Sequence, residues 1–181
     1  MTKTFRFKAV DPEHRALVHS WLKMPHVAKW FYGQGLKNTL NHLDEFLEGS
    51  SSSHYWLAYD NNHPFAFLIT SFVSKTDELA CWCSEEGEAM TLDILIGDLD
   101  YLGKGLAPLL IREFLTSQFP HIAEVLIDPE ATNTCAIHVY QKVGFTILAE
   151  FIPAHSPHPH YMMRLSMKQL KKNLEKNQFP L

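Results

Sequence analysis

The stretch LDILIGDLDYLGKGLAPLLIREFL, residues 92–115, decides the fold because it joins three local patterns without a break. Its apolar start predicts a strand, which runs through a Gly-Lys-Gly turn at 103–105. Pro108 fits only the first turn of a helix, so the helix begins at about residues 104–107. The first amides of a helix lack internal partners, and the helix dipole adds positive potential there. We therefore expect this turn to hold a phosphate.

Two familiar phosphate loops do not fit the turn. A Walker loop requires G-x4-G-K followed by Ser or Thr, but Gly97 stands one residue too far from Gly103 and Lys104 is followed by Gly105. The dinucleotide-binding fingerprint requires a third glycine where this chain has Pro108. Both readings fail.

The run L-G-K-G-L-A at 102–107 instead resembles the pyrophosphate loop of the GNAT superfamily of N-acetyltransferases, Gln/Arg-x-x-Gly-x-Gly/Ala. Gly105 and Ala107 match this pattern, whereas Leu102 stands where the family more often has Arg or Gln. Taken alone, the loop is also compatible with an ordinary strand-to-helix turn. The resemblance implies a coenzyme site that includes Leu95, Ile96, Leu102, Gly103, Lys104, Gly105, Leu106 and Ala107.

A second segment, AEVLIDPEATNTCAIHVYQKVGF at 123–145, follows at the distance that the family requires. A short strand is broken at Asp128-Pro129, and a helix then closes at Gly144. Asn133, Ala136 and Tyr140 share one face of this helix, and N-x-x-A-x-x-x-Y-x-x-x-G-F matches the second coenzyme A motif of the family. Asn133 could instead be a helix cap and Tyr140 a core aromatic residue. The two segments together imply that Asn133, Ala136 and Tyr140 also bind the coenzyme.

The implied architecture is the α/β (α+β) GNAT fold in a single domain over residues 1–181. It has a central mixed, mostly antiparallel sheet of six to seven strands, splayed at strands 4 and 5 and flanked by helices. Asp11-Pro12 predicts the start of a helix, with Asp11 as N-cap and Pro12 as the first helical residue. Asn61-Asn62-His63 predicts a hairpin turn. The patterns predict strands at 4–10, 54–60, 64–73, 90–97, 122–128, 145–152 and 160–166. They predict helices at 12–23, 39–48, 103–118, 133–143 and 167–176.

Composition agrees with one enzyme domain, since 181 residues with 46% hydrophobic content suffice for a single core. We expect no membrane association, because no signal-like start and no apolar run of about 18 residues is found, and the basic C-terminal MKQLKKNLEK favours a solvated helix over an anchor. The three cysteines indicate reduced thiols in a cytoplasmic protein, and Cys81 and Cys83 lack partners for a zinc site. The net charge of −4 disfavours nucleic acid and suits a cationic partner. The expected oligomeric state is monomer or homodimer.

The acceptor residues are expected in SWLKMPHVAKWFYGQG, residues 20–35. This segment resembles the W-L-x-x-x-H-V-x-x-W stretch of two GNAT branches, the aminoglycoside 6'-N-acetyltransferases and the acyltransferases that modify hydroxylysine in siderophore synthesis. By that resemblance Trp30, Phe31 and Tyr32 help to wall the acceptor cleft. Trp21 is interpreted as core, and a core role is also the alternative for Trp30.

One residue in the strand before the coenzyme loop distinguishes the two branches. Siderophore enzymes tend to have His in a G-L-H-L-L-I-G-like run, whereas this chain has Asp93 in T-L-D-I-L-I-G, as the aminoglycoside branch does. A carboxylate suits a polycationic acceptor such as an aminoglycoside or another small polyamine, and it can accept the proton of the attacking ammonium. Glu78 and Asp128 are further expected acceptor ligands. Five carboxylates lie in twelve residues from Asp77 to Glu88, including Glu85 and Glu86, although such runs are usually solvated loops.

The resemblance implies direct transfer from acetyl-CoA, without a covalent enzyme intermediate and without a metal. Asp93 is the expected base or amine anchor, and Tyr140 is expected to protonate the leaving thiolate. Amides near Leu95 and Ile96 would stabilise the oxyanion. A Cys135 nucleophile assisted by His138 is the disfavoured alternative.

The segment HSPHPHY carries His155, His158 and His160 within six residues and could hold a metal. Its two prolines favour a stiff loop that covers the acceptor cleft, as that segment does in related enzymes. Two other functions also stay open: a siderophore-type hydroxylysine acyltransferase, and a protein or peptide N-acetyltransferase or non-enzymatic coenzyme A-binding module.

Overall fold

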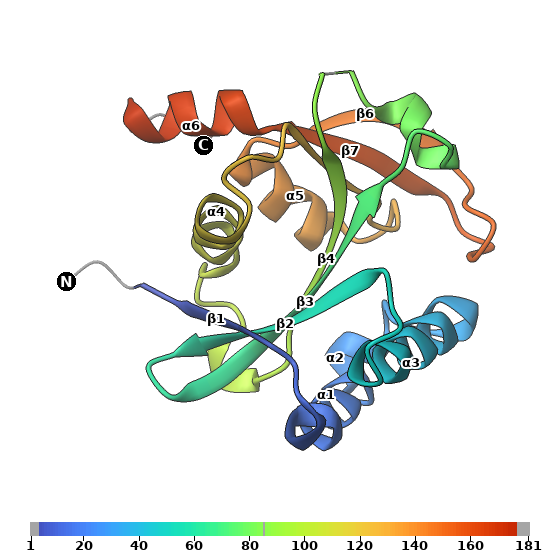
Figure 1. Cartoon of the computed structure of the whole chain (residues 1–181), viewed down its shortest axis with the longest axis vertical. Coiled ribbons are helices and arrows are strands. Elements are labelled where there is room, and N and C mark those ends of the chain that lie inside the picture. Colours follow the sequence, from blue (N-terminus) through green and yellow to red (C-terminus); the bar gives the residue numbers. More distant parts are fainter. Residues whose placement is uncertain (1–3, 85, 177–181) are drawn as a thin grey trace. The chain divides into compact units, whose positions relative to one another are not determined.

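The computed structural model describes residues 4–84 and 86–176 (Figure 1). The chain divides into two compact units. Unit 1 comprises Met1–Ser71 and Asp93–Leu106, and unit 2 comprises Phe72–Leu92 and Ala107–Leu181. Each unit is described below by itself, as far as the described residues reach. The single domain expected over residues 1–181 stays a prediction.

Unit 1 contains an antiparallel run of strands, β1 (Arg6–Ala9), β2 (Ser53–Asp60) and β3 (His63–Val73), of which β3 extends two residues into unit 2. β1 pairs with β2, and β2 pairs with β3 with a register shift after Ala58. Asn61 in the turn between β2 and β3 has a φ of 56°. Asparagine tolerates this left-handed conformation better than most residues, so the predicted hairpin turn is confirmed.

Four helices of unit 1 lie between β1 and β2 in the chain: η1 (Pro12–His14), α1 (Arg15–Leu22), α2 (Pro25–Ala28) and α3 (Gly33–Leu47). Asp11 caps η1 through a 3.2 Å hydrogen bond from the His14 amide to its carboxylate, as expected. The chain does not form one helix over 12–23 but a 3-10 turn followed by α1. Pro25 then starts α2, which the sequence patterns did not predict.

Helix α3 begins at Gly33, six residues before the predicted start at 39. Its first turn is Gly-Gln-Gly, which has poor helix propensity, and this composition concealed the beginning. The apolar spacing does reach back, because Leu36 and Leu40 pack against the same core as the fully buried Leu43. Packing against the core therefore stabilises the first turn of α3 despite the low helix propensity of its glycines.

The core of unit 1 lies between these helices and strands and includes Leu95 of β4 (Ala89–Ile96). Trp21 is 4% exposed within this core, so its interpretation as a core residue is confirmed. Its indole lies directly against the backbone of Gly97, where a Cβ atom would be only 1.9 Å from Trp21 Cδ2. The Gly97 and Asp98 amides both donate to the Phe65 carbonyl, at 2.9 and 3.1 Å. The chain that enters the glycine loop is thus fixed in place.

Unit 2 contains the first half of β4 together with β5 (Glu124–Ile127), β6 (Thr146–Phe151) and β7 (His160–Ser166). β4 and β5 are parallel, and their pairing covers only residues 89–91 and 124–126. β7 pairs antiparallel with both β5 and β6. The strand order is β1-β2-β3-β4-β5-β7-β6 in a seven-stranded sheet. The predicted mixed, mostly antiparallel sheet flanked by helices is confirmed.

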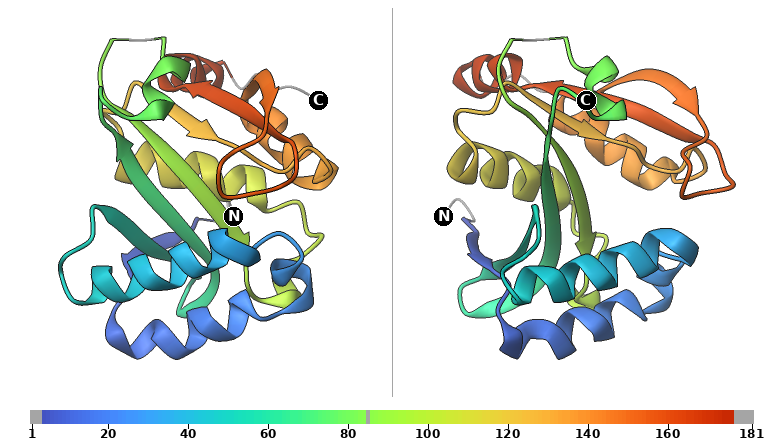
Figure 2. Two further views of the ribbon diagram at one scale, coloured as in Figure 1. Left: turned by 90° about the vertical axis from the view of Figure 1, so that its right-hand side faces the viewer. Right: turned by 45° about the vertical axis from the view of Figure 1, so that its right-hand side comes forward.

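Two helices of unit 2, α4 (Ala107–Gln118) and α5 (Thr134–Val143), lie side by side (Figure 2). Arg112 of α4 donates a 2.9 Å hydrogen bond to the carbonyl of Lys142 near the end of α5. In α4, Leu110 and Phe114 are fully buried, whereas Leu109, and Leu106 directly before the helix, are half-buried. The remaining buried positions of α4 are Ile111 and Leu115.

The last helix, α6 (Met167–Glu175), buries Met167 and Leu170. Lys171 donates to the carbonyl of Pro120 at 2.6 Å, so the helix is fastened within unit 2 as a closing helix. Among the described residues, no helix combines the length and the apolar character needed to cross a bilayer. Two short 3-10 helices, η2 (Glu78–Trp82) and η3 (Leu99–Tyr101), stand where loops were expected.

Replacement of Gly97 by alanine is expected to destabilise unit 1. The new methyl group would overlap the Trp21 indole, and neither the strand backbone nor the buried ring can move without losing packing. We expect a loss of about 3 kcal/mol in the free energy of unfolding, measured by urea denaturation.

The control is the same substitution in a Trp21→Leu background, where the ring is absent. The penalty of Gly97→Ala should shrink to less than half there, in a double-mutant cycle. An equal penalty in both backgrounds would show that the cost comes from the backbone and not from Trp21.

Candidate functional site

The glycine loop at 102–107 has the backbone geometry that the sequence implied. Gly103 and Gly105 each have a φ of 67°, in the left-handed region that favours glycine. A Cβ atom at either glycine would meet nothing within 4 Å, so conformation and not space requires glycine there. Residues 103–105 are exposed, and α4 begins at Ala107, with Pro108 in its first turn. The loop therefore presents amides to solvent at a helix N-terminus, an arrangement suited to an anion.

The strand before the loop holds three of the expected residues. Leu95 is buried in the core of unit 1, whereas Asp93 is exposed on β4. Burial, and after it the nearby Asp93 carboxylate, raises the pKa of the Tyr55 phenol well above its ordinary value. Tyr55 therefore stays a neutral phenol beside the Asp93 charge at physiological pH.

The carbonyl of Ile96 is held by His26, whose Nε2 lies 2.9 Å away. A carbonyl only accepts, so His26 donates this hydrogen bond from a neutral or protonated ring. The sequence motif W-L-x-x-x-H-V-x-x-W contains His26, but no role for His26 was predicted from it. Its contact ties α2 to the end of β4 within unit 1.

The segment from Trp30 to Tyr32 connects α2 and α3, as the expected helix end and loop. Trp30 is half-buried and its ring lies under the Lys29 ammonium, 4.6 Å from Nζ to the ring centroid. Phe31 packs against the core of unit 1, and Tyr32 is 37% exposed. Trp30 and Tyr32 thus keep ring surface available, whereas Phe31 is partly a core residue.

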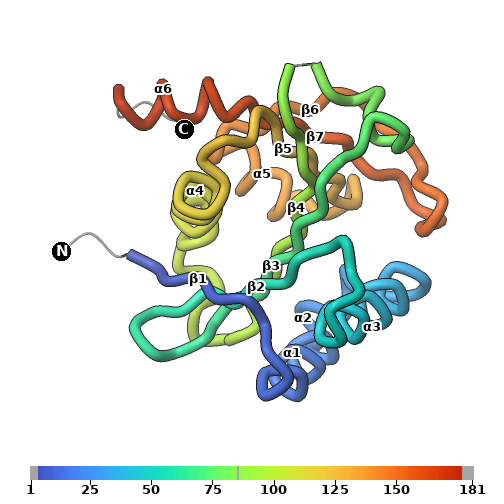
Figure 3. Tube along the Cα trace, viewed as in Figure 1, coloured from blue at the N-terminus to red at the C-terminus, as the bar shows by residue number. Residues whose placement is uncertain are grey.

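The second coenzyme segment lies in unit 2, where the chain can be followed from β5 through residues 128–133 into α5 (Figure 3). Asn133 is the N-cap of α5, with its side-chain oxygen 3.2 Å from the Ala136 amide. Tyr140 is 7% exposed and its ring packs on Phe145, with 5.8 Å between the centroids. Asn133 therefore caps the helix, and Tyr140 packs as a core aromatic residue, as the alternative interpretations of these two residues described. These contacts also fix the face that carries Ala136.

Two expected acceptor ligands also belong to unit 2. Glu78 is exposed at the start of η2, and Asp128 is half-buried directly after β5. Within the acidic run, Glu86 and Glu88 are exposed, and Glu85 lies outside the described residues. The run is therefore not a plain loop, because η2 occupies residues 78–82.

The expected site residues divide between the two units. Unit 1 carries Trp30, Phe31, Tyr32, Asp93, Leu95, Ile96 and residues 102–106. Unit 2 carries Glu78, Ala107, Asp128, Asn133, Ala136 and Tyr140. Within unit 1, the chain from Asp93 to Leu106 is continuous, so the candidate base and the glycine loop belong to one segment.

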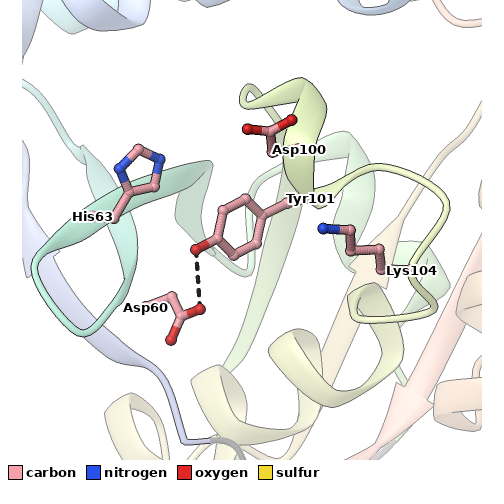
Figure 4. Close-up of a pocket in the computed structure, with 5 residues that line it drawn as sticks. All are labelled: Asp60, His63, Asp100, Tyr101 and Lys104. Atoms are coloured by element: carbon pink, nitrogen blue, oxygen red, sulfur yellow. Dashed lines mark hydrogen bonds between the residues drawn. The ribbon is translucent and has the colours of Figure 1, made fainter.

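A polar pocket of about 450 Å³ adjoins the glycine loop within unit 1 and was not expected from the sequence (Figure 4). Its lining residues are Asp60, His63, Asp100, Tyr101 and Lys104. Tyr101 donates to Asp60 at 2.9 Å and stacks on Phe65 at 4.5 Å between the ring centroids. Burial, followed by the hydrogen bond to Asp60, raises the pKa of Tyr101.

His63 reinforces this arrangement through its ring and its partner Asp98. The His63 ring stacks on Tyr101 with an interplanar angle of 11°, and its Nε2 is hydrogen-bonded to the Asp98 carboxylate. This hydrogen bond lowers the pKa of Asp98. Tyr101, the residue that leads into the loop, is thus held on two sides by the β2–β3 hairpin.

The histidines of the HSPHPHY segment and the cysteines can also be placed. His160 Nδ1 lies 2.6 Å from the carbonyl of Asp128 and 3.4 Å from its carboxylate. Burial lowers the pKa of His160, but the hydrogen bonds and the charge of Asp128 outweigh it, so the pKa is raised. Cys81, Cys83 and Cys135 are free thiols, of which Cys81 and Cys135 are exposed.

Solved structures and known proteins resemble this chain over most of its length. A crystal structure of an aminoglycoside N(6')acetyltransferase from Legionella pneumophila subsp. pneumophila str. Philadelphia 1 is 44% identical, covers 96% of this chain and 98% of its own, and superposes with a TM-score of 0.87. The aminoglycoside N(6')-acetyltransferase type 1 of Klebsiella pneumoniae is 28% identical over 138 residues, 72% of this chain and 68% of that protein.

A lysine N-acyltransferase matches more weakly. The lysine N-acyltransferase MbtK of Mycobacterium sp. (strain MCS) is 23% identical over 155 residues, which are 83% of this chain and 63% of that protein. The family model described as acetyltransferase (GNAT) domain matches residues 11–152, a span that includes α1, β4, the glycine loop and α5. The chain therefore belongs to the GNAT family of acetyltransferases.

Proposed function

We propose that this acetyltransferase transfers the acetyl group of acetyl-CoA to the 6'-amine of an aminoglycoside. The observation that carries the proposal is the 44% identity, over 96% of this chain and 98% of the other, to the aminoglycoside N(6')acetyltransferase of Legionella pneumophila. As a GNAT enzyme the protein uses acetyl-CoA as its acyl donor.

For the coenzyme, we assign the pyrophosphate to the amides of Gly103, Lys104, Gly105, Leu106 and Ala107. The left-handed glycines in an exposed turn and the start of α4 at Ala107 support this assignment, because the first amides of a helix have no partner within the helix. Leu102 differs from the Arg or Gln common in the family, but backbone amides do not depend on that side chain. Asn133, Ala136 and Tyr140 would contact the rest of the coenzyme from unit 2.

For the acceptor, we assign the amine-binding role to Asp93. Its exposure on β4 supports the role, since a cationic amine can reach an exposed carboxylate from solvent. Trp30, Phe31 and Tyr32 would provide apolar surface for the sugar rings, and Glu78 and Asp128 further negative charge. The net charge of −4 also favours the approach of a polycation.

The reaction is a direct transfer. The acceptor ammonium first loses a proton, for which Asp93 is the proposed base, and the free amine attacks the thioester carbonyl. Amides near Leu95 and Ile96 would stabilise the oxyanion of the tetrahedral intermediate. The C–S bond then breaks, Tyr140 would give its proton to the coenzyme thiolate, and the nitrogen loses its second proton to solvent while Tyr140 regains one from solvent. His26 holds the Ile96 carbonyl at the end of β4. This contact supports the proposal, because a fixed strand end keeps the amides near Leu95 and Ile96 in place for the reaction.

The second candidate is a siderophore-type hydroxylysine acyltransferase, favoured by the similarity to the lysine N-acyltransferase MbtK. Asp93 argues against it, because that branch tends to have His at this position. A neutral hydroxylamine acceptor would also gain less from an exposed carboxylate than a polycation does.

Replacement of Asp93 by asparagine tests the proposed function. Thiol release from acetyl-CoA is measured with kanamycin, tobramycin, a hydroxylysine and a peptide amine. We expect turnover with the aminoglycosides, and a loss of kcat/KM of about 100-fold or more in Asp93→Asn, because the variant can neither accept a proton nor pair with an ammonium. A loss mainly in kcat indicates a base, and a loss mainly in KM indicates an anchor.

The matched control is Glu48→Gln, which removes an exposed carboxylate at the end of α3 and should retain full activity. Turnover confined to the hydroxylysine would assign the protein to the siderophore branch, and turnover confined to the peptide would assign it to the protein acetyltransferases. Full aminoglycoside activity in Asp93→Asn would reject the assigned role of Asp93.

Replacement of Gly105 by alanine tests the loop. Alanine at a φ of 67° costs about 1–2 kcal/mol, and the loop can relieve this strain by turning its amides away from the pyrophosphate. We expect coenzyme A to bind about tenfold more weakly in isothermal titration calorimetry.

Gly49→Ala is the control with the same strain. Gly49 has a φ of 81° and, like Gly105, no atom within 4 Å of an added Cβ, but it follows α3, outside the loop. It should lower stability and leave coenzyme affinity unchanged. Equal affinities for Gly105→Ala and the unaltered protein would mean that the loop does not bind the pyrophosphate in this conformation.

A further inference from the structure

Three side chains that commonly bind metal ions meet within unit 2. Asp128 directly follows β5, His160 begins β7, and His155 lies in the loop between β6 and β7 (orange in Figure 2). One ligand atom from each residue lies within 4.8 Å of the others. The histidines already suggest a metal in the sequence, whereas Asp128, 27 residues before His155 in the chain, is expected there only as an acceptor ligand.

Backbone pairing fixes two of the three residues. The Tyr161 amide donates to the Pro129 carbonyl at 3.0 Å, and the Ala131 amide donates to the Pro159 carbonyl at 2.8 Å. Glu130 and His160 form an isolated antiparallel bridge. Asp128 and His160 are therefore held together by the main chain on both sides of the cluster.

The His160 ring makes the kind of hydrogen bond that ligating histidines make. Its Nδ1 donates to the Asp128 carbonyl at 2.6 Å, and a carbonyl can only accept, so Nδ1 carries the proton. In the neutral ring Nε2 then holds the lone pair. Ligating histidines typically donate their other ring N–H to a carbonyl or carboxylate in this way.

His155 completes the cluster from a stiff loop. Its ring meets the His160 ring edge to face, with 5.6 Å between the centroids at an angle of 88°. Pro153, Pro157 and Pro159 restrict the loop, which lowers the entropy cost of holding His155 in place. His155 is exposed, so its side chain can shorten the span to the roughly 3.4 Å between ligands of a tetrahedral site.

We propose that Asp128, His155 and His160 bind a divalent transition-metal ion, with Zn²⁺ as the best fit. Two imidazoles and one carboxylate match the ligands that zinc accepts, and the fourth position stays open for water. Calcium and magnesium prefer oxygen ligands and fit this set less well. The bound ion would fasten the β6–β7 loop to the end of β5.

The inference is independent of the proposed function, because its readouts are metal binding and loop protection and not acetyl transfer. Asp128 is also a proposed acceptor ligand, so an activity assay would mix the two roles. The measurements below can fail while the acetyltransferase assignment stands, and the reverse also holds.

The test is calorimetric titration of the full chain with Zn²⁺, at pH 8 under thiol-reducing conditions and without a histidine tag. We expect one equivalent to bind, and His155→Ala to weaken this binding by about tenfold or more. His155 is exposed in a loop, so the variant should fold, and its thermal unfolding in the absence of metal checks this.

His158→Ala is the matched control, since His158 lies in the same loop but not in the cluster. It should bind Zn²⁺ like the unaltered protein. Hydrogen exchange at residues 152–158 should slow with Zn²⁺ in the unaltered protein and in His158→Ala, but not in His155→Ala. The proposal is overturned if no Zn²⁺ binds, or if His155→Ala binds it with unchanged affinity, because other groups such as Cys81 and Cys83 would then be the ligands.

Discussion

The contact between the Trp21 indole and the backbone of Gly97 is the constraint on which the candidate site depends. It requires a residue without a side chain at the end of β4, and the ring then covers the strand. Two further interactions act on the same few residues: His26 holds the Ile96 carbonyl, and the Gly97 and Asp98 amides donate to Phe65. The helices of unit 1 thereby define where β4 stops and where the glycine loop starts.

Much of this arrangement could be predicted from the sequence, because glycine and proline act locally. Gly103, Gly105 and Pro108 specify the turn and the first residues of α4 without reference to any partner, and Gly144 similarly ends α5 with a φ of 118°. Helix α3 could not be delimited in this way, since its first turn has low propensity and is stabilised by packing. Tyr101 with Asp60, and Asp128 with His155, are close only after the strands pair, and spacing along the chain gives no sign of either.

The two halves of the candidate site use different chemistry. The proposed coenzyme contacts come largely from main-chain amides, whose positions depend on φ and ψ and therefore on a few glycines. The proposed acceptor contacts come from side chains, among them Asp93 and Trp30. A change of acceptor in such a fold requires only side-chain substitutions, which agrees with the similarity of this chain to both aminoglycoside and lysine acyltransferases.

Strand β4 also has a consequence for the order in which the chain can fold. The core of unit 1 contains Leu95, although the other residues of that core lie between Val10 and Ile69. During synthesis, the N-terminal helices and strands therefore leave the ribosome before the residue that completes their core. The core of the first unit is complete only when β4 has emerged, and the apolar surface that Leu95 covers stays exposed during that interval.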